Sequence, residues 1–242
     1  MRADIHNHSC LSPCGDLYAS PSAMVRTARE RGIDLMALTD HNSARNAPAF
    51  AESCRREGLM ALFGTETTSR EEVHILSVFA TVEDAESWGR WVYQRLPDFQ
   101  HDPERFGDQV VVDADEHILD FEPRYLIPAI DASIDEIRQE TLLRGGLIIP
   151  AHIDRTTNSM LSQLGFLPDL EFSALEITTW PPATDPRGHT LICDSDAHFI
   201  DDVARRSFSF TADISGESSQ NEIFAALSGA LAQGTVSLSI EP

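Results

Sequence analysis

The sequence of 242 residues predicts an α/β fold in which short buried strands alternate with helices around a barrel. Short apolar runs, such as Ile33–Leu38 and Leu147–Ile149, are typical of strands that a parallel sheet buries on both faces. Histidines and carboxylates stand where these runs stop. A β/α barrel assembles an active site in this way, from residues at the ends of separate strands. The pattern therefore predicts a barrel that carries a metal-binding site.

Helix signals lie between the apolar runs. Each predicted helix ends at a glycine just before a run: the first begins at Ser20-Pro21 and ends at Gly32, the second covers 46–57 and ends at Gly58, and the third begins with a capping box of Ser133 and Glu136 and ends at Gly145-Gly146. This helix–glycine–strand order is what successive β/α units require, and it predicts right-handed crossovers.

One segment, residues 81–132, interrupts this order. It contains an aromatic helix with Trp88 and Trp91, then a loop and a hairpin that pairs 109–112 with 117–119. We expect an insertion that covers the cleft or makes a subunit contact, and a surface excursion without function is an equal alternative. The chain then ends in an amphipathic helix, 221–231, and a last strand, 235–240.

Composition limits the possible functions. The length suits one domain, 1–242, that contains the insertion. No apolar stretch is long enough to span a bilayer and no signal sequence is evident, so we expect a cytoplasmic protein with no membrane partner. Four cysteines do not make a disulfide framework. The formal net charge of −21 repels phosphate backbones and argues against nucleic acid as a partner, whereas a small anionic substrate remains compatible with bound cations.

The N-terminal motif is the first candidate site. In a strand, His6 and His8 project to the same side, where two imidazoles can bind one divalent ion. The tight turn that follows could bring Cys14 back to them. A thiolate ligand would favour zinc, although Cys14 could equally be a small buried residue of the turn.

Further candidates follow at other strand ends. His41 is a candidate ligand, and the adjacent Asp40 is expected to orient it or to accept a proton. Glu66 has two oxygens that can bridge two cations. The pair Asp196 and His198 repeats the spacing of His6 and His8, and His74 and His152 add two imidazoles. Four residues are expected outside the site: His101, His117 and His189 on the surface, and Asp194 pointing away.

These motifs resemble those of the polymerase and histidinol phosphatase (PHP) family: His6-Asn-His8, Thr39-Asp-His41, Gly64-Thr-Glu66, Pro150-Ala-His152 and Ser195-Asp-Ala-His198. The resemblance implies a distorted (β/α)7 barrel with up to three metals at the carboxyl ends of the strands. It assigns His6, His8, Glu66 and Asp196 to one metal, Glu66, His74 and His152 to a second, and Cys14, His41 and His198 to a third. Relatives similar to histidinol phosphatases carry a histidine where this chain has Cys14. If Cys14 is not a ligand, Asp16 is the nearest substitute.

The resemblance implies a hydrolase that cleaves phosphate esters of a small metabolite or nucleotide through metal-activated water, with two or three divalent ions. Zinc is favoured, and manganese and iron are alternatives. Asp40, Glu66 and Asp196 are the expected catalytic residues. Arg155 is the candidate phosphate contact, and Arg124 is a weaker one for which we favour a surface salt bridge.

Two other classes of function stay open. An amidohydrolase-like enzyme would cleave C–N bonds, but the sequence contains no lysine, so a carbamylated lysine bridge is excluded and only a glutamate bridge is possible. A non-catalytic metal-binding regulator is the other alternative. The sequence specifies neither the substrate nor the oligomeric state.

Overall fold

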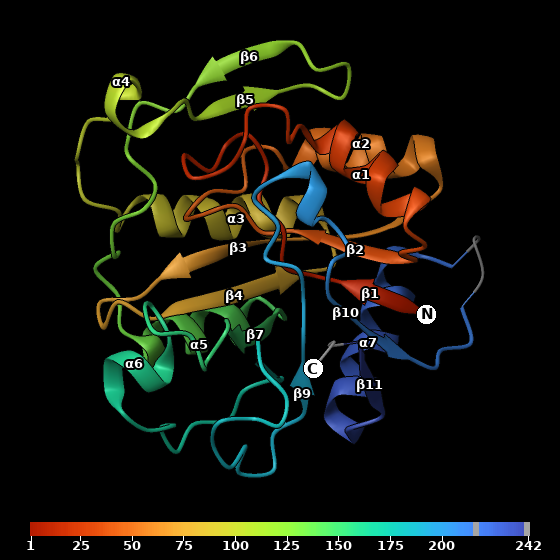
Figure 1. Ribbon diagram of the computed structural model, residues 1–242. Helices are drawn as coiled ribbons and strands as arrows, with labels where there is room; N and C mark the ends of the chain where they lie inside the picture. Colours follow the sequence, from red (N-terminus) through yellow and green to blue (C-terminus); the bar gives the residue numbers. More distant parts are fainter. Residues whose placement is uncertain (215–217, 240–242) are drawn as a thin grey trace.

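The computed structural model describes residues 1–214 and 218–239, with the elements arranged as in Figure 1. The helices are α1 (Pro21–Glu30), α2 (Ala47–Glu57), α3 (Val82–Tyr93), α4 (Pro103–Phe106), α5 (Ile134–Leu143), α6 (Met160–Leu164) and α7 (Gln220–Gln233), with one 3-10 turn, η1 (Ile200–Asp202). The strands are β1 (Arg2–Asp4), β2 (Leu35–Leu38), β3 (Met60–Thr68), β4 (His74–Phe79), β5 (Val110–Val112), β6 (Ile118–Phe121), β7 (Leu147–Pro150), β8 (Leu175–Glu176), β9 (Leu191–Ile192), β10 (Ser207–Phe210) and β11 (Val236–Ser239).

A curled, seven-stranded sheet forms the centre of the fold, in the order β11-β10-β1-β2-β3-β4-β7. The predicted α/β class is confirmed, but the sheet is mixed and does not show seven regular β/α units. Strands β1, β2 and β3 are parallel, whereas β4 is antiparallel to both of its neighbours. The reversal follows from the connection between β3 and β4, because a turn as short as residues 69–73 joins only antiparallel strands.

The separate pair β8–β9 fills the gap between the two ends of this curl. The amide of Ile153, which follows β7, donates a hydrogen bond to the carbonyl of Glu176 on β8 at 2.9 Å. On the other side, the amide of His8 donates to the carbonyl of Ala197 at 2.9 Å. The segments after β1 and after β9 therefore lie side by side, as the barrel prediction requires.

Local signals explain where most elements begin and end. The Ser20 hydroxyl caps α1 by accepting a bond from the amide of Ala23, and Ser133 and Glu136 form the predicted capping box of α5. Gly58 ends α2 in the left-handed conformation that a glycine adopts without strain. The predicted hairpin is present as β5 and β6. Of the predicted last strand, residue 240 lies outside the described residues.

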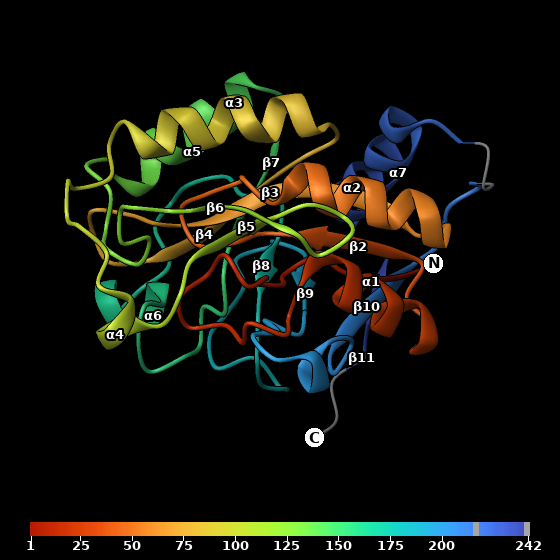
Figure 2. The ribbon, with the colours of Figure 1, turned by 90° about the horizontal axis from the view of Figure 1, so that it is seen from above.

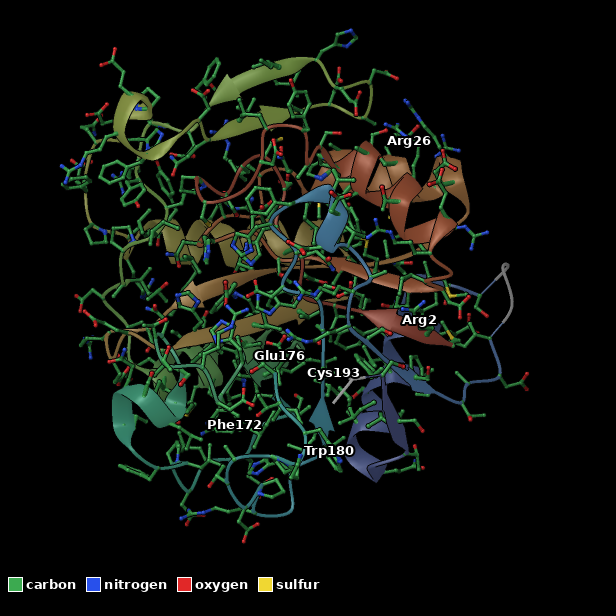
Figure 3. All side chains as sticks on the ribbon, in the orientation of Figure 1. Arg2, Arg26, Phe172, Glu176, Trp180 and Cys193 are labelled. Atoms are coloured by element: carbon green, nitrogen blue, oxygen red, sulfur yellow. The ribbon has the colours of Figure 1, made fainter. Side chains whose placement is uncertain are left out.

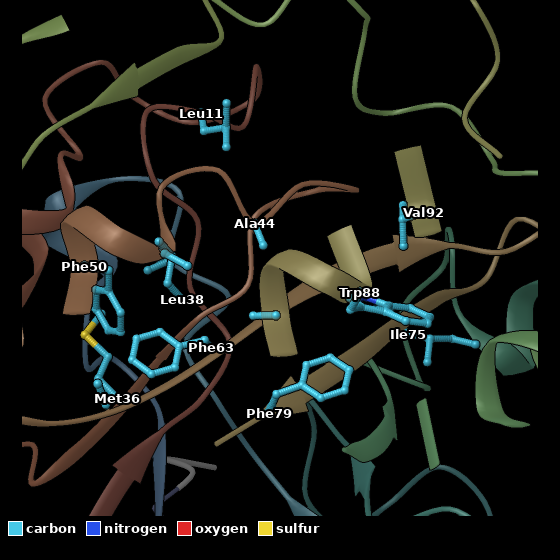
Figure 4. Close-up of a cluster of buried hydrophobic side chains, with 14 of the residues drawn as sticks. Leu11, Met36, Leu38, Ala44, Phe50, Phe63, Ile75, Phe79, Trp88 and Val92 are labelled. Atoms are coloured by element: carbon cyan, nitrogen blue, oxygen red, sulfur yellow. The ribbon is translucent and has the colours of Figure 1, made fainter. Parts of the chain in front are cut away.

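The sheet is buried on both faces. Along β2, Met36 and Leu38 face a cluster packed against α1 and α2, whereas Leu35 and Ala37 face the interior of the curl. Figure 4 shows Met36 beside Phe50 of α2 and Phe63 of β3. Figure 2 shows α3 and α5 above the sheet and β8 and β9 below it. Helix α7 packs its apolar side chains into the inner cluster, near the amino ends of the strands.

The segment 81–132 forms α3, α4 and the β5–β6 hairpin, which lies apart from the main sheet in Figure 1. The loop before α2 anchors it. The buried Asn46 side chain donates to the Ser9 hydroxyl and to the Val110 carbonyl, and it accepts a bond from the Val112 amide. Arg45 pairs with the buried Glu122 at 3.0 Å. Across the described residues, no helix is long and apolar enough to cross a membrane.

Candidate metal centre

Six chain segments bring histidines and carboxylates to one rim of the curled sheet. These residues follow β1 (His6, His8), follow β2 (Asp40, His41), lie in β3 (Glu66), begin β4 (His74), follow β7 (His152) and follow β9 (Asp196, His198). His74 reaches this rim because β4 is reversed, so that the start of β4 lies beside the carboxyl end of β3. Apart from Asp40, each of these residues places its side chain among the others.

The first group is a buried set of four side chains: His6, His8, Glu66 and Asp196. The Nε2 atoms of His6 and His8 lie 3.1 Å apart. Asp196 Oδ1 lies 3.2 Å from His6 Nε2 and 3.1 Å from His8 Nε2. The two oxygens of Glu66 lie 3.4 Å from His6 Nε2 and 3.3 Å from His8 Nε2. Four potential ligand atoms therefore converge on one small volume.

Glu66 connects this group with the other imidazoles. Its Oε2 lies 3.1 Å from His41 Nδ1, and its Oε1 lies 2.8 Å from His74 Nδ1 and 3.0 Å from His152 Nε2. Glu66, His41 and His74 form a second potential ligand group, and His8, His41 and His198 form a third. Glu66 is therefore placed as a bridging carboxylate would be. The side chains of His74 and His198 are partly exposed, so the rim is open to solvent on their side.

Two neighbouring groups fix how His6 and His8 present their rings. His6 Nδ1 lies 2.9 Å from Glu176, a buried carboxylate that sequence analysis missed. The Ser12 hydroxyl donates to Asp40 at 2.8 Å and therefore accepts from His8 Nδ1 at 3.2 Å. A carboxylate only accepts hydrogen bonds, so His6 Nδ1 must donate to Glu176. Both rings consequently turn Nε2 toward the cluster.

This arrangement fits divalent cations. Two Nε2 atoms and two carboxylates face one another, and all four are acceptors unless a proton or a cation lies among them. Buried Asp196 Oδ1, His41 Nδ1 and His152 Nδ1 have no hydrogen-bond partner. Bonds of about 2.1 Å to one ion place neighbouring ligand atoms roughly 3.0–3.4 Å apart, and the separations in the first group fall in this range. The mixture of imidazoles and carboxylates suits zinc, manganese or iron.

The charges of the site are strongly coupled. Burial by itself lowers the pKa of His8, but the nearby carboxylates of Asp196 and Glu66 raise that pKa to about 9. Burial by itself raises the pKa of Glu66, yet the surrounding imidazoles hold it well below its usual value. Burial and the charge of His8 lower the pKa of His198 to about 4 and hold that of His41 well below its ordinary value. Without metal, the cluster is therefore an imidazolium–carboxylate network in which protons occupy the places of cations.

The backbone is strained at two of these residues. His152 has φ 29° and Asp196 has φ 48°, conformations that residues other than glycine seldom adopt. Such strain persists where the surrounding structure holds it, and it is common at functional sites. It places the two side chains inward at points where the strands have already ended.

The structure does not bring every predicted residue to the cluster. Among the described residues, Cys14 and His152 belong to none of the three ligand groups, although His152 Nε2 lies 3.0 Å from Glu66 Oε1. Cys14 is an exposed residue overall, while partial burial of its thiol and the nearby charge of Glu66 raise the pKa of that thiol to about 12. The suggested substitute, Asp16, accepts a bond from the Tyr18 amide at 2.9 Å instead. Asp40 has both oxygens bonded to Ser9 and Ser12, which favours the orienting role over proton transfer.

The two candidate arginines lie in different places, and both form salt bridges. Arg155 Nη1 lies 2.5 Å from Asp196 Oδ2, and its side chain is 39% exposed, so it reaches from the cluster toward solvent. Arg124 instead stacks on Tyr93 and pairs with Asp98, in the insertion. Four other residues lie outside the ligand groups: His101, His117, His189 and Asp194, whose Oδ1 accepts a bond from the Ile5 amide.

The family model of the PHP domain matches residues 4–141, more than half of the chain. The chain belongs to the PHP family. It is 28% identical over 134 residues to DNA polymerase III PolC-type of Thermotoga maritima, which covers 55% of this chain and 8% of that protein. The same identity, over 79 residues, relates it to an uncharacterized protein of Methanocaldococcus jannaschii, with 29% of this chain and 46% of that protein covered. The chain thus spans less than half of either curated relative.

Solved structures share the PHP fold. Endonuclease Q of Pyrococcus furiosus superposes with a TM-score of 0.65 and 17% identity, covering 98% of this chain and 57% of that chain. A Bifidobacterium adolescentis protein assigned as a metal-dependent phosphoesterase gives a TM-score of 0.55 and 20% identity, covering 81% and 87%. Family membership together with the ligand groups supports a metal-dependent hydrolase.

One prediction from composition is wrong. Net charge argued against nucleic acid, yet another endonuclease Q structure, with a TM-score of 0.63 over 94% of this chain, holds a duplex with an abasic lesion at the active site. The same fold therefore accommodates DNA at its active site. Net charge is a sum over the whole surface and does not describe the few side chains around one cleft.

Proposed function

We propose that this protein is a metal-dependent phosphoesterase whose active site is the rim around Glu66. The observation that carries the proposal is the convergence of four buried acceptors, His6, His8, Glu66 and Asp196, beside a half-exposed arginine. When bound there, divalent ions would lower the pKa of a water molecule and polarise a phosphoryl oxygen. The assignment of individual ligands to two or three ions is part of this proposal, and Cys14, which lies outside the three ligand groups, is not among the ligands that we propose.

The chain's own residues supply binding and orientation. Arg155 presents a guanidinium at the open side of the cluster, where its fork geometry matches a phosphate. Its pairing with Asp196 holds it at the rim until a substrate arrives. Asp40 holds the turn of Ser9 and Ser12 in place and thereby the ring of His8. A partly exposed imidazole, His74 or His198, can deliver a proton to the departing alkoxide.

The substrate class is the open part of the proposal. Small phosphomonoesters and nucleotides fit a compact rim with one guanidinium. Nucleic acid phosphodiesters enter for a separate reason, since endonuclease Q has the same fold and binds duplex DNA. The insertion borders the turn that contains Cys10, because the Val110 amide donates to the Cys10 carbonyl at 3.0 Å. We therefore expect segment 81–132 to select among these substrates.

The test is a substrate panel on metal-free protein reloaded with zinc, manganese or iron, with metal counted per chain. The panel contains phosphomonoesters, nucleotides and duplex oligonucleotides with and without an abasic site. Phosphate or strand release that Glu66→Gln and Asp196→Asn abolish in folded protein supports the proposal. Ammonia release from amide substrates supports the C–N hydrolase instead. No turnover at full metal occupancy favours a metal-binding regulator.

Arginine variants test substrate binding separately. Arg155→Gln removes the guanidinium at the rim and should raise KM for the phosphate substrate by about 10- to 100-fold, since a charged hydrogen bond contributes about 1.5–3 kcal/mol. Arg124→Gln is the matched control, because Arg124 stacks on Tyr93 in the insertion. Equal kinetics for both variants would remove Arg155 from the proposed binding site.

A further inference from the structure

Glu176 connects the segments that follow β1 and β7 at the level of the ligand cluster. It lies on β8, which pairs only with β9 among the described strands, and its side chain is 1% exposed. Figure 3 shows it in the interior of the molecule. Its carboxylate contacts His6, after β1, and His152, after β7. One buried side chain thus bridges the segment after β1 and the segment after β7.

On the side of β1, Glu176 fixes the ring of His6. Oε2 lies 2.9 Å and Oε1 lies 3.1 Å from His6 Nδ1. The carboxylate offers only acceptors, so Nδ1 must carry a proton. Nε2 is then the ligand atom, and it faces His8, Asp196 and Glu66.

On the side of β7, Glu176 holds the strained backbone. Its Oε2 accepts from the His152 amide at 2.8 Å, and its own carbonyl accepts from the next amide, Ile153, at 2.9 Å. Two consecutive amides around the positive φ of His152 are therefore bound to one residue. A conformation of this kind costs about 1–3 kcal/mol and needs such contacts to persist.

From these contacts we infer that Glu176 is a positioning residue for the metal centre, which sets the ligand tautomer of His6 and holds His152 inward. The inference rests on the proposed metal-dependent function and names a residue that acts on it without touching substrate. Because a carboxylate behind a ligating imidazole typically changes metal affinity by about 10–100-fold, we expect Glu176→Gln to weaken zinc binding by that factor.

The test is a competition between zinc-loaded protein and a chelator, on the full chain. Glu122→Gln is the matched control, because Glu122 is an equally buried glutamate with donors from Arg45, Tyr93 and Arg124, all outside the ligand groups. Unchanged zinc affinity in Glu176→Gln, or an equal loss in Glu122→Gln, overturns the inference. Glu176→Asp, which keeps the charge and shortens the reach, should recover part of the affinity.

Nitrogen-resolved NMR of the zinc-loaded wild-type protein decides the matter even if the variants fail to fold. A proton on His6 Nδ1, shifted downfield by a carboxylate, supports the inference, and an unprotonated Nδ1 overturns it. Phosphate release is measured separately. If the wild-type protein binds zinc with this tautomer but hydrolyses no phosphate ester, the proposed function is wrong and the positioning role of Glu176 still stands.

Discussion

Ser12→Ala offers a sharp test of how the turn after β1 supports the site. The Ser12 hydroxyl is fully buried and makes three hydrogen bonds: it donates to Asp40 at 2.8 Å and accepts from the His41 amide at 3.1 Å and from His8 Nδ1 at 3.2 Å. The bond to the ionised carboxylate contributes about 1.5–3 kcal/mol and each of the others about 0.5–1 kcal/mol. We therefore expect the free energy of unfolding to fall by about 3 kcal/mol.

The measurement is urea unfolding of metal-free protein. Ser53→Ala is the control, since this buried serine makes one bond, to the Ala49 carbonyl of its own helix, and should cost about 1 kcal/mol. Zinc affinity of Ser12→Ala should fall roughly tenfold or more, because the ring of His8 loses its orienting partner. A Ser12 variant as stable as the Ser53 variant, with unchanged zinc affinity, would refute the reasoning.

Three further predictions concern protons, buried charge and packing. Burial lowers the pKa of His8, but its carboxylate neighbours raise that pKa to about 9, so the ring is protonated at pH 7 and zinc must displace that proton on binding. Calorimetry of zinc binding in two buffers of different ionisation enthalpy should therefore show the release of at least one proton. Binding heats that do not depend on the buffer would contradict this prediction. Burial, Glu176 and Asp4 raise the pKa of Asp194 well above its ordinary value, so its contribution to stability is present below its unfolded pKa and is lost as pH rises through the folded pKa. Asp194→Asn removes this pH-dependent loss, so the free energy of unfolding of the variant relative to wild type should increase with pH by up to about 1.4 kcal/mol per pH unit. Urea unfolding of metal-free protein at several pH values measures this difference. A difference that stays constant at every pH would contradict the prediction. Gly64→Ala would place a methyl group on the carbonyl oxygen of Ser77 in the neighbouring strand, and in thermal unfolding it should lower the free energy of unfolding by about 3 kcal/mol or more. Gly229→Ala, with open space around it, is the control and should be neutral or stabilising. Equal effects of the two substitutions would count against the close approach of β3 and β4 at Gly64.

Much of the site followed from the sequence because parallel strands end at one rim. His6, His41 and His152 each follow an apolar run, and the structure brings all three beside Glu66. The order of helices and glycines also predicted α1, α2 and α5. These signals depend only on nearby residues in the sequence, and the sheet brings the resulting strand ends together.

The remainder depended on tertiary contacts that leave no local pattern. The reversal of β4 follows from the short turn before it, but the apolar runs alone do not distinguish parallel from antiparallel strands. Glu176 sits in a strand of two residues, Leu175–Glu176, too short for any periodic signal. Ser12 is one of several serines in a turn. A resemblance to relatives with a histidine could not show that Cys14 would lie outside the ligand groups.

The anchoring of the hairpin by Asn46 has a practical consequence for engineering. The Asn46 side chain forms hydrogen bonds with the backbone of Val110 and Val112 in β5, and it also donates to the Ser9 hydroxyl in the turn behind His8. Deletion of the hairpin would leave the buried Asn46 amide without its partners in β5 and would also loosen that turn. A chimera that exchanges hairpins between homologues must therefore transfer Asn46 together with the segment that contains Val110 and Val112, or the turn behind His8 will lose its support.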